Sequence, residues 1–462
     1  MTDQAKTRGY ALQAMLLLCG LVAGCNNRSE MLHERDVAPM GDLPSLQTVA
    51  DPQLRDELAR IVEEGGTPEQ LAAEPIPDKE NVWHALDQVQ KRSSRAKSSG
   101  QSIDIFLELY PRPQQPFPRE SLREAAIFGS RFANRWDDVK EALRRPDCDF
   151  GLDPRKGQFV DLSFIDLLQT LSRVDAFIAA RSISSGELYS AVEPIGSMLL
   201  MARYLGKQRH LGCRLAAAQM RSEALLVIEA ACRHKMADRQ LLQDIQELLL
   251  IELALWSPDA DAWIGDRAQA LHGYEVIRAG QINNLIDRDF EEHLAFEGLL
   301  KELLHTAQHA IDPDQLYYLT TMRSLIAAAQ QAKRSRTAKS CKARRYAMQR
   351  IYDGIRNRDK DAETLIATRL FLAGLPDAIR HIDEDRAACE AWVLALAHAL
   401  GHKRPKNIST INPVSGTPYQ ESVENGVAVV WHDGGGIGGV KRPVRVPVPA
   451  GTANAAARTK SR

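Results

Sequence analysis

The chain has 462 residues with 59 basic and 60 acidic side chains, and its formal net charge of −1 at pH 7 excludes an overall electrostatic attraction to nucleic acid. Its length suits two or three typical domains or one extended helical array. Aromatic residues make up only 6% of the chain, and the helix formers Ala, Leu, Arg, Glu and Gln are plentiful. We therefore expect a mainly helical protein with no nucleic-acid partner.

The first 24 residues have the pattern of a bacterial lipoprotein signal peptide. Lys6 and Arg8 precede an apolar stretch at residues 14–22. The stretch fits a signal sequence of roughly 7–15 apolar residues and is shorter than the about 20 that span a membrane. It ends in Val-Ala-Gly-Cys at residues 22–25, which resembles a lipobox. We predict lipidation of Cys25; the alternatives are an ordinary signal peptide cut nearby and an uncleaved apolar N-terminus.

A lipid on Cys25 would hold the protein at a membrane without crossing it. Each buried methylene contributes about 0.8 kcal/mol, so two or three acyl chains together give firm attachment. We expect the membrane to be a partner through this anchor, with the mature chain in the cell envelope facing the periplasm or the exterior. Asn26 and Asn27 stand in place of the aspartate that retains many lipoproteins in the inner membrane, which favours the outer membrane.

Residues 25–102 are predicted to form a tether with short helices and a linker. The helices are expected at residues 52–64 and 80–91, and the basic, serine-rich run at 92–100 has nothing to bury. Residues 103–406 form the predicted helical domain, where apolar side chains recur at steps of three and four.

The helices expected in this domain are joined by short loops. They lie near residues 119–136, 164–178, 186–204, 215–232, 238–256, from 258 onward, 292–310, 313–332, 342–356, 361–373 and 378–402. Pro194 is expected to kink or split its helix, and Asp238 to cap the helix that it precedes. Helices joined by short turns pack antiparallel to their neighbours. The predicted fold class is all-α: antiparallel helical hairpins forming a bundle or an irregular solenoid.

The pattern changes after Pro405. Turn residues at 412–418 and a β-type run at 427–431 predict a small C-terminal β-like closing element over residues 407–433. Residues 434–462 are rich in Pro, Ala and Arg and are predicted to be a disordered tail.

Two sets of motifs carry a resemblance to known proteins. The run from Leu143 to Asp153 and the motif Gly-Asp-Arg-Ala at residues 265–268 resemble a set of helical bacterial lipoprotein-like proteins without an assigned activity. The segment Asn-Pro-Val-Ser-Gly-Thr-Pro-Tyr at 412–419, followed by the run at 427–431, is similar to the C-terminal module of type II secretion pseudopilins. The resemblance implies an envelope location and assigns no catalytic residue.

Two histidine pairs are the candidates for metal binding. His305 and His309, and likewise His398 and His402, are spaced i, i+4, so each pair shares one helix face. The glutamate of a His-Glu-x-x-His motif is missing from both pairs, and such histidines more often pack or lie on a solvated face. We keep them as the only metal-ligand candidates, name no catalytic residue and expect no cofactor.

The densest basic run covers residues 333–345. Such a run can bind an anion, an acidic partner or a lipid head group, but the interpretation favoured here is a solvated loop between two helices.

The cysteines after Cys25 are candidates for disulfides because the envelope can be oxidising. They are Cys148, Cys213, Cys232, Cys341 and Cys389. The favoured interpretation is that all are buried small apolar residues; the alternative is a single bridge between Cys341 and Cys389.

The function that these observations favour is a membrane-anchored helical binding or scaffold lipoprotein of the cell envelope, with envelope proteins as partners. One alternative is an accessory factor of a type II secretion-like assembly. The other, from a different class, is a metal-dependent enzyme that uses the paired histidines.

Overall fold

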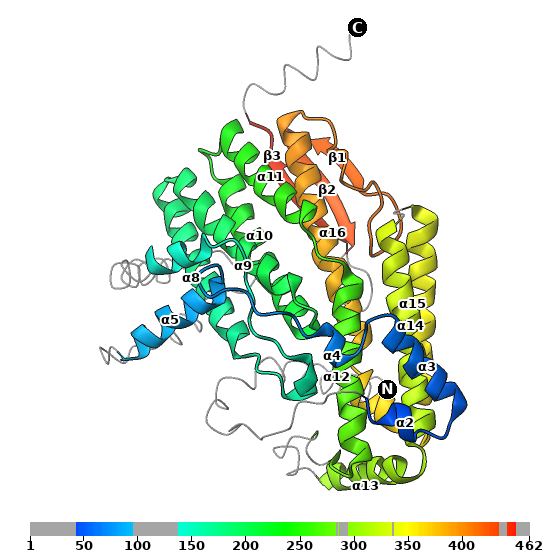
Figure 1. The fold of residues 1–462 in the computed structure, drawn as a ribbon. Helices are drawn as coiled ribbons and strands as arrows, with labels where there is room; N and C mark the ends of the chain where they lie inside the picture. The colour runs from blue at the N-terminus through cyan, green and yellow to red at the C-terminus, as the bar shows by residue number, and fades with distance from the viewer. Residues whose placement is uncertain are drawn as a thin grey trace.

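The computed structural model describes residues 43–95, 137–282, 285, 294–334, 337–433 and 441–449. Cys25, the linker beyond residue 95 and the predicted helix at 119–136 lie outside the described residues. The described part is mostly helical, with a three-stranded antiparallel sheet near its C-terminal end (Figure 1). The predicted fold class, all-α with a small C-terminal β element, is confirmed.

Within the described residues, four helices precede the main helical body. They are α2 (Ser45–Thr48), α3 (Pro52–Glu63), α4 (Pro68–Leu71) and α5 (Val82–Arg95). Asp51 caps α3 by accepting from the backbone N–H groups of Gln53 and Leu54 at 2.7 and 3.2 Å, and a proline follows at the first helical position, where its missing N–H costs no helical bond. Both short helices predicted in this region are confirmed.

The main body is a series of antiparallel helices. They are the 3-10 helices η2 (Pro154–Phe159) and η3 (Leu188–Ala191), α8 (Ser163–Ser185), α9 (Val192–Lys207), α10 (Leu211–Arg233), α11 (Arg239–Ala254), α12 (Asp259–Arg278), α13 (Leu294–His309), α14 (Ile311–Arg334), α15 (Ala338–Arg358), the π-helix η6 (Ala367–Phe371) and α16 (Leu375–Leu400). Asp238 caps α11 as predicted, accepting from the N–H of Leu241 at 2.9 Å. No helix within the described residues is long and apolar enough to cross a membrane.

The stretch predicted as helix at residues 186–204 is split in two, as one of the two outcomes predicted for Pro194 requires: a 3-10 helix, η3, ends at Ala191 and α9 follows. Gly186, with a φ of 85°, ends α8 before them. Helix α9 begins at Val192, which places Pro194 in the first turn. The first N–H groups of a helix have no intrahelical partner, so a proline is tolerated there.

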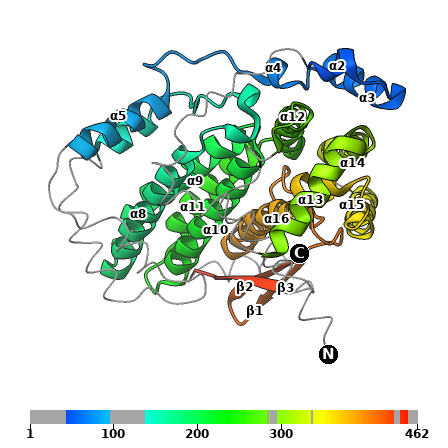
Figure 2. The same ribbon diagram turned by 90° about the horizontal axis from the view of Figure 1, so that it is seen from below.

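Helix α16 joins two separate apolar cores. Its N-terminal half, with Leu375 and Ile382, packs with Trp263 and Tyr318 in the core formed around α12 and α14. Its C-terminal half, with Leu396, packs in a second core against α10, α11 and the sheet. In Figure 2, α8–α11 lie on one side of α16 and α12–α15 on the other, with the sheet along one edge. The two halves of the body are therefore held together along one long helix.

The closing sheet consists of β1 (Gln420–Glu424), β2 (Val427–Asp433) and β3 (Lys441–Pro447), in that order. Asn425 and Gly426, with φ of 52° and 75°, form the tight β1–β2 turn. Strand β3 lies within residues 434–462, where a disordered tail is predicted, and the prediction is wrong for this segment. Its apolar Val444 and Val446 are buried at 5% and 0% exposure in the core with α16, and this burial orders the strand.

A buried carboxylate organises the π-helix that precedes α16. The side chain of Asp314 on α14 accepts hydrogen bonds from the backbone N–H groups of Ile366 and Ala367 at 2.8 and 2.9 Å, and from the Tyr274 hydroxyl at 2.5 Å. Burial raises the pKa of Asp314 to about 7 despite these three donors. Helix α14 and the π-helix are thus fixed to α12 through one acidic group.

Candidate functional site

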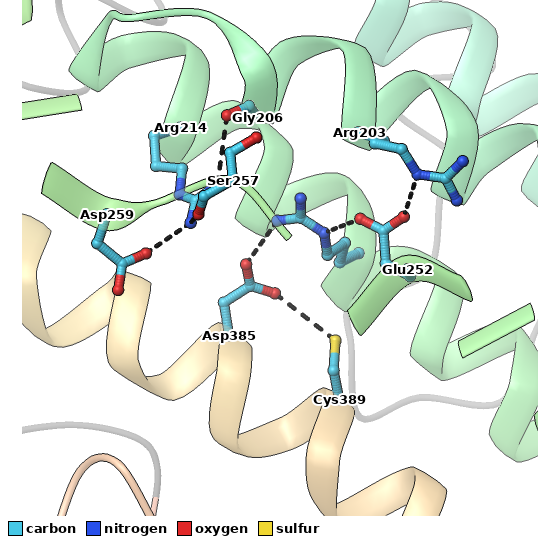
Figure 3. Close-up of polar contacts among 9 residues, drawn as sticks. Arg203, Gly206, Arg214, Glu252, Ser257, Asp259, Asp385 and Cys389 are labelled. Carbon is cyan, nitrogen blue, oxygen red and sulfur yellow. Dashed lines mark hydrogen bonds and ion pairs between the residues drawn. The ribbon is translucent and has the colours of Figure 1, made fainter. Parts of the chain in front are cut away.

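The strongest concentration of polar chemistry is a buried ionic network between the two cores. Arg221 on α10 donates through Nε to Glu252 of α11 and through Nη1 to Asp385 of α16, both at 2.7 Å. The other oxygen of Glu252 accepts from Arg203 Nε of α9 at 3.0 Å. Figure 3 shows these side chains converging from four helices. We call these four residues the Arg221 network.

A second buried arginine extends the polar region toward α12. Arg214 lies about two turns before Arg221 on α10. It donates to the Asp259 carboxylate at 2.5 Å and to the Ser257 carbonyl at 2.8 Å. Asp259 lies in the first turn of α12, where its charge also suits the helix N-terminus. Asp259 is therefore the ion-pair partner of Arg214.

Trp256 separates the two arginines. The guanidinium carbon of Arg221 lies 4.3 Å from the Trp256 ring centroid, and those of Arg214 and Arg386 lie 5.2 Å from it. Arg386 in turn donates to Glu390 at 3.1 Å, and Glu390 accepts from the Tyr419 hydroxyl at 3.0 Å. Arginine is the cation best suited to stacking on indole while it pairs with carboxylates.

Burial sets the electrostatics of the network. The side chains of Arg221 and Glu252 each retain 1% of their accessible surface. Burial acts against the charge of Arg221, but Asp385 and Glu252 outweigh it and raise its pKa. Burial raises the pKa of Asp385 to about 6, and Arg221 opposes that rise. Cations and anions therefore alternate between helices, and each charge is held by its neighbour on another helix.

This arrangement favours packing over reaction. Cys389, whose Sγ lies 3.9 Å from Asp385 Oδ1, is fully buried, and burial raises the pKa of its thiol. A nucleophilic cysteine needs a lowered pKa and access to solvent. Within the described residues, the Arg221 network joins four helices through buried ion pairs.

The histidine pairs lie in different parts of the fold. The rings of His305 and His309 on α13 are 4.6 Å apart, so this pair does share one face. His398 near the end of α16 contacts the Glu421 carboxylate, which also pairs with Arg404. His402 lies beyond the helix end, with Nε2 3.3 Å from Arg239 Nη2.

The surroundings of His398 oppose a cation. Burial and the nearby Arg404 cation lower its pKa, and the same positive charge would repel a metal ion. Among the residues that the structure describes, no three His, Cys, Asp or Glu side chains are grouped to hold a metal. Neither pair thus acquires a third ligand in this part of the chain.

The cysteines after Cys25 are all buried. Their exposed fractions run from 0% for Cys213 and Cys389 to 8% for Cys341. Cys389 is a free thiol, so the alternative of a Cys341–Cys389 bridge is wrong. The favoured interpretation, buried apolar residues, is confirmed.

Two of the open hollows on the surface are lined by described residues. One, of about 510 Å³, lies between α3, α14 and the end of α15 and contains Glu57, Arg60 and Arg323. Glu57 is 4% exposed and pairs with both arginines. The other, of about 580 Å³, lies beside α5 and contains His84 and Arg145. Both are open to solvent and lined by side chains of both charges.

Compared with known proteins, the chain matches no family model, no curated protein and no solved structure. The resemblance to lipoprotein-like proteins and to the pseudopilin module therefore stays a prediction.

Proposed function

We propose that the protein is a lipid-anchored binding scaffold of the cell envelope, held at the membrane through Cys25 and presenting a rigid helical body to a protein partner. The motif at residues 22–25 supports the anchor. The arrangement of helices supports the scaffold, because helical arrays offer long outer faces at fixed positions.

The observation that carries this proposal is the Arg221 network. Its charged groups face neighbouring helices inside the fold instead of converging on an open cavity. Enzymes place ionisable groups with shifted pKa values where a substrate reaches them. Here Asp385, whose pKa is raised, is enclosed and joins α16 to α10. The buried ion pairs thus hold the helices in fixed positions relative to one another, as a scaffold requires.

The proposal is tested by cross-linking in intact cells, followed by purification of the full chain from detergent-solubilised envelope. We expect one envelope protein to be enriched in a fixed ratio to the chain. Cys25→Ser is the control, because it removes the anchor and leaves the body unchanged; the ratio should fall in this variant. Recovery of the cross-linked wild-type chain as a monomer would overturn the proposal.

Metal analysis of the same preparation separates the scaffold from the metal-dependent enzyme. The scaffold predicts no stoichiometric Zn²⁺ or iron in the purified chain. A stoichiometric metal that is lost in His305→Ala or His398→Ala would favour the enzyme instead.

A further inference from the structure

The basic run at residues 333–345 is helical over most of its length. Helix α14 continues to Arg334, and α15 begins at Ala338, capped by the Thr337 hydroxyl, which accepts from the Ser340 N–H at 3.1 Å. The interpretation of this run as a loop between helices is therefore wrong. The charges of α15 are placed at regular helical spacing on a defined surface.

Helix α15 is an outer helix of the body. It packs on α14 and touches η6, and both views place it at the margin of the molecule (Figures 1 and 2). Its buried side carries Cys341 and Ile355. Residues on the opposite side, such as Tyr346, Gln349 and Asp353, are exposed.

This outer side is basic and aromatic. Arg345, Arg350 and Arg356 are exposed, and Tyr346 and Tyr352 retain 69% and 40% of their accessible surface. Arg345, Tyr352 and Arg356 follow one another at steps of seven and four residues and share one side of the helix. Tyr346 and Arg350, four residues apart, lie about 100–140° further round it, so the five side chains together cover the outer half of α15. At about 1.5 Å per residue the arginines span about 17 Å. We call these five residues the α15 face.

The positive charge of the α15 face is not balanced locally. Within the described residues, no carboxylate lies in ion-pair range of Arg345, Arg350 or Arg356, whereas exposed arginines elsewhere, such as Arg144 and Arg233, pair with a glutamate one turn away. Asp353, which lies between Arg350 and Arg356, accepts from Gln349 at 2.9 Å, and Asp359 at the end of α15 pairs with Arg369. The chain as a whole has a net charge of −1, so the positive charge of the α15 face is a local concentration and does not reflect the overall composition.

The position of the tether relates this face to the membrane. Leu43, the first described residue, is 3% exposed and packs in the same core as Tyr318 and Met322 of α14, the helix that carries α15. Eighteen residues from Cys25 to Leu43 reach at most about 60 Å when extended, and about 23 Å as a flexible coil. This step rests on the proposed function: with a lipid on Cys25, the α15 face lies within reach of the bilayer.

We propose that the α15 face binds anionic phospholipid head groups of the membrane that carries the anchor. Guanidinium groups bind phosphate oxygens through paired hydrogen bonds, and basic helices are attracted to anionic lipid surfaces. Tyrosine side chains favour the head-group level of a bilayer, since one end of the ring is apolar and the other is polar. The α15 face thus orients the anchored body on the membrane.

The test uses an unlipidated chain that begins at residue 26, so that the result does not depend on Cys25. This chain keeps every residue that the structure describes, and therefore every core contact given above. Sedimentation is measured with vesicles of equimolar phosphatidylglycerol and phosphatidylcholine, and with phosphatidylcholine alone. We expect binding to the anionic vesicles only, weakened by added salt.

The decisive variant replaces the three arginines together: Arg345→Gln, Arg350→Gln and Arg356→Gln. Binding to the anionic vesicles should fall at least about tenfold. The matched control makes the same change at three exposed arginines elsewhere, Arg144, Arg181 and Arg233, and should bind as the parent chain does. Circular dichroism and urea unfolding check that both variants keep the fold; if the triple variant unfolds, Arg350→Gln alone should still weaken binding.

Two results would overturn this proposal: no binding of the parent chain to anionic vesicles, or equal loss in the α15 variant and the control. If the α15 face bound an acidic protein and not the anionic vesicles, the first of these results would be observed and the proposal would be overturned. Loss of fatty-acid labelling at Cys25, by contrast, would overturn the proposed anchor and leave the vesicle result in place.

Discussion

Arg221 and Asp385 are 164 residues apart in the sequence, and Arg221 Nη1 donates to Asp385 Oδ2 at 2.7 Å in the fold. This pair lies where the two halves of α16 pass from one apolar core to the other. Two buried carboxylates share the one guanidinium of Arg221, and Glu252 also accepts from Arg203. The orientation of α10, α11 and α16 depends on this arginine.

Replacement of Arg221 by methionine should strongly destabilise the fold. The change keeps much of the side-chain volume and leaves Glu252 and Asp385 without their shared cation. Breaking a buried ion pair costs about 3–5 kcal/mol. We expect a loss of about that size in the free energy of unfolding measured with urea. Arg233→Met on the same helix is the control: Arg233 is 55% exposed and pairs with Glu229 one turn away, and its loss should cost at most about 1 kcal/mol. Equal losses would contradict the structural role of the network.

Stability should depend on pH through Asp314. Burial raises the pKa of Asp314 to about 7, whereas in the unfolded chain it is about 3.9. The folded chain therefore retains a proton that the unfolded chain loses between these values, so this contribution is complete below about pH 4 and is lost as pH rises to about 7. Between about pH 5 and 7.5 the free energy of unfolding should fall by about 2 kcal/mol more in the wild type than in Asp314→Asn. Parallel pH profiles would show that Asp314 is ionised in the fold.

Gly265→Ala tests the close approach of α12 to the segment before α10. A Cβ atom at Gly265 would lie 1.8 Å from the backbone oxygen of Arg209, which cannot move aside as a side chain can. We expect destabilisation of at least about 1–3 kcal/mol by urea unfolding. Gly298→Ala on α13 is the control, because a Cβ there meets nothing within 4 Å. That change should be neutral or stabilise by up to about 1 kcal/mol; similar effects at the two sites would contradict the close packing.

The buried thiols should resist alkylation in the native protein. Cys213 and Cys389 are 0% exposed, and burial raises the pKa of Cys232 to about 12. Iodoacetamide at neutral pH should therefore leave these three unmodified until urea unfolds the chain, as peptide mapping by mass spectrometry will show. Rapid labelling of Cys389 in the folded protein would mean that the Arg221 network opens to solvent.

The sequence predicts features that depend on near neighbours. Asp238 caps α11 through a bond to Leu241, three residues on, so its role follows from residue type and position. The i, i+4 spacing likewise predicts that His305 and His309 share a face. Local geometry of this kind is contained in a few consecutive residues.

Strand β3 shows where local patterns mislead. Pro443 and Pro447 interrupt a short run next to glycines, and proline cannot donate to a strand ladder, so the segment has the composition of a disordered tail. The fold accepts these prolines because β3 lies at the edge of the sheet, paired with β2 alone. The turn residues Asn425 and Gly426 were the available signal for a hairpin on the other side of β2.

The Arg221 network lies beyond prediction from one sequence. Glu252 is 31 residues from Arg221 and Asp385 is 164 residues away, and nothing in the periodicity of α10 distinguishes Arg221 from a solvated arginine. The same limit applies to the α15 face, where the basic residues are visible in the sequence but their exposed side depends on packing against α14.

The anchor at Cys25 is the central claim of the proposed function, and fatty-acid labelling tests it most directly. Cells that express the wild-type chain, Cys25→Ser or Cys19→Ser are grown with an alkyne-tagged palmitate, and the purified chains are examined for the tag. Cys19 lies within the apolar stretch at residues 14–22 and serves as the matched control. We predict labelling of the wild type and of Cys19→Ser and none of Cys25→Ser, with the label on the peptide that begins at Cys25. Labelling of Cys25→Ser at the wild-type level would contradict the anchor.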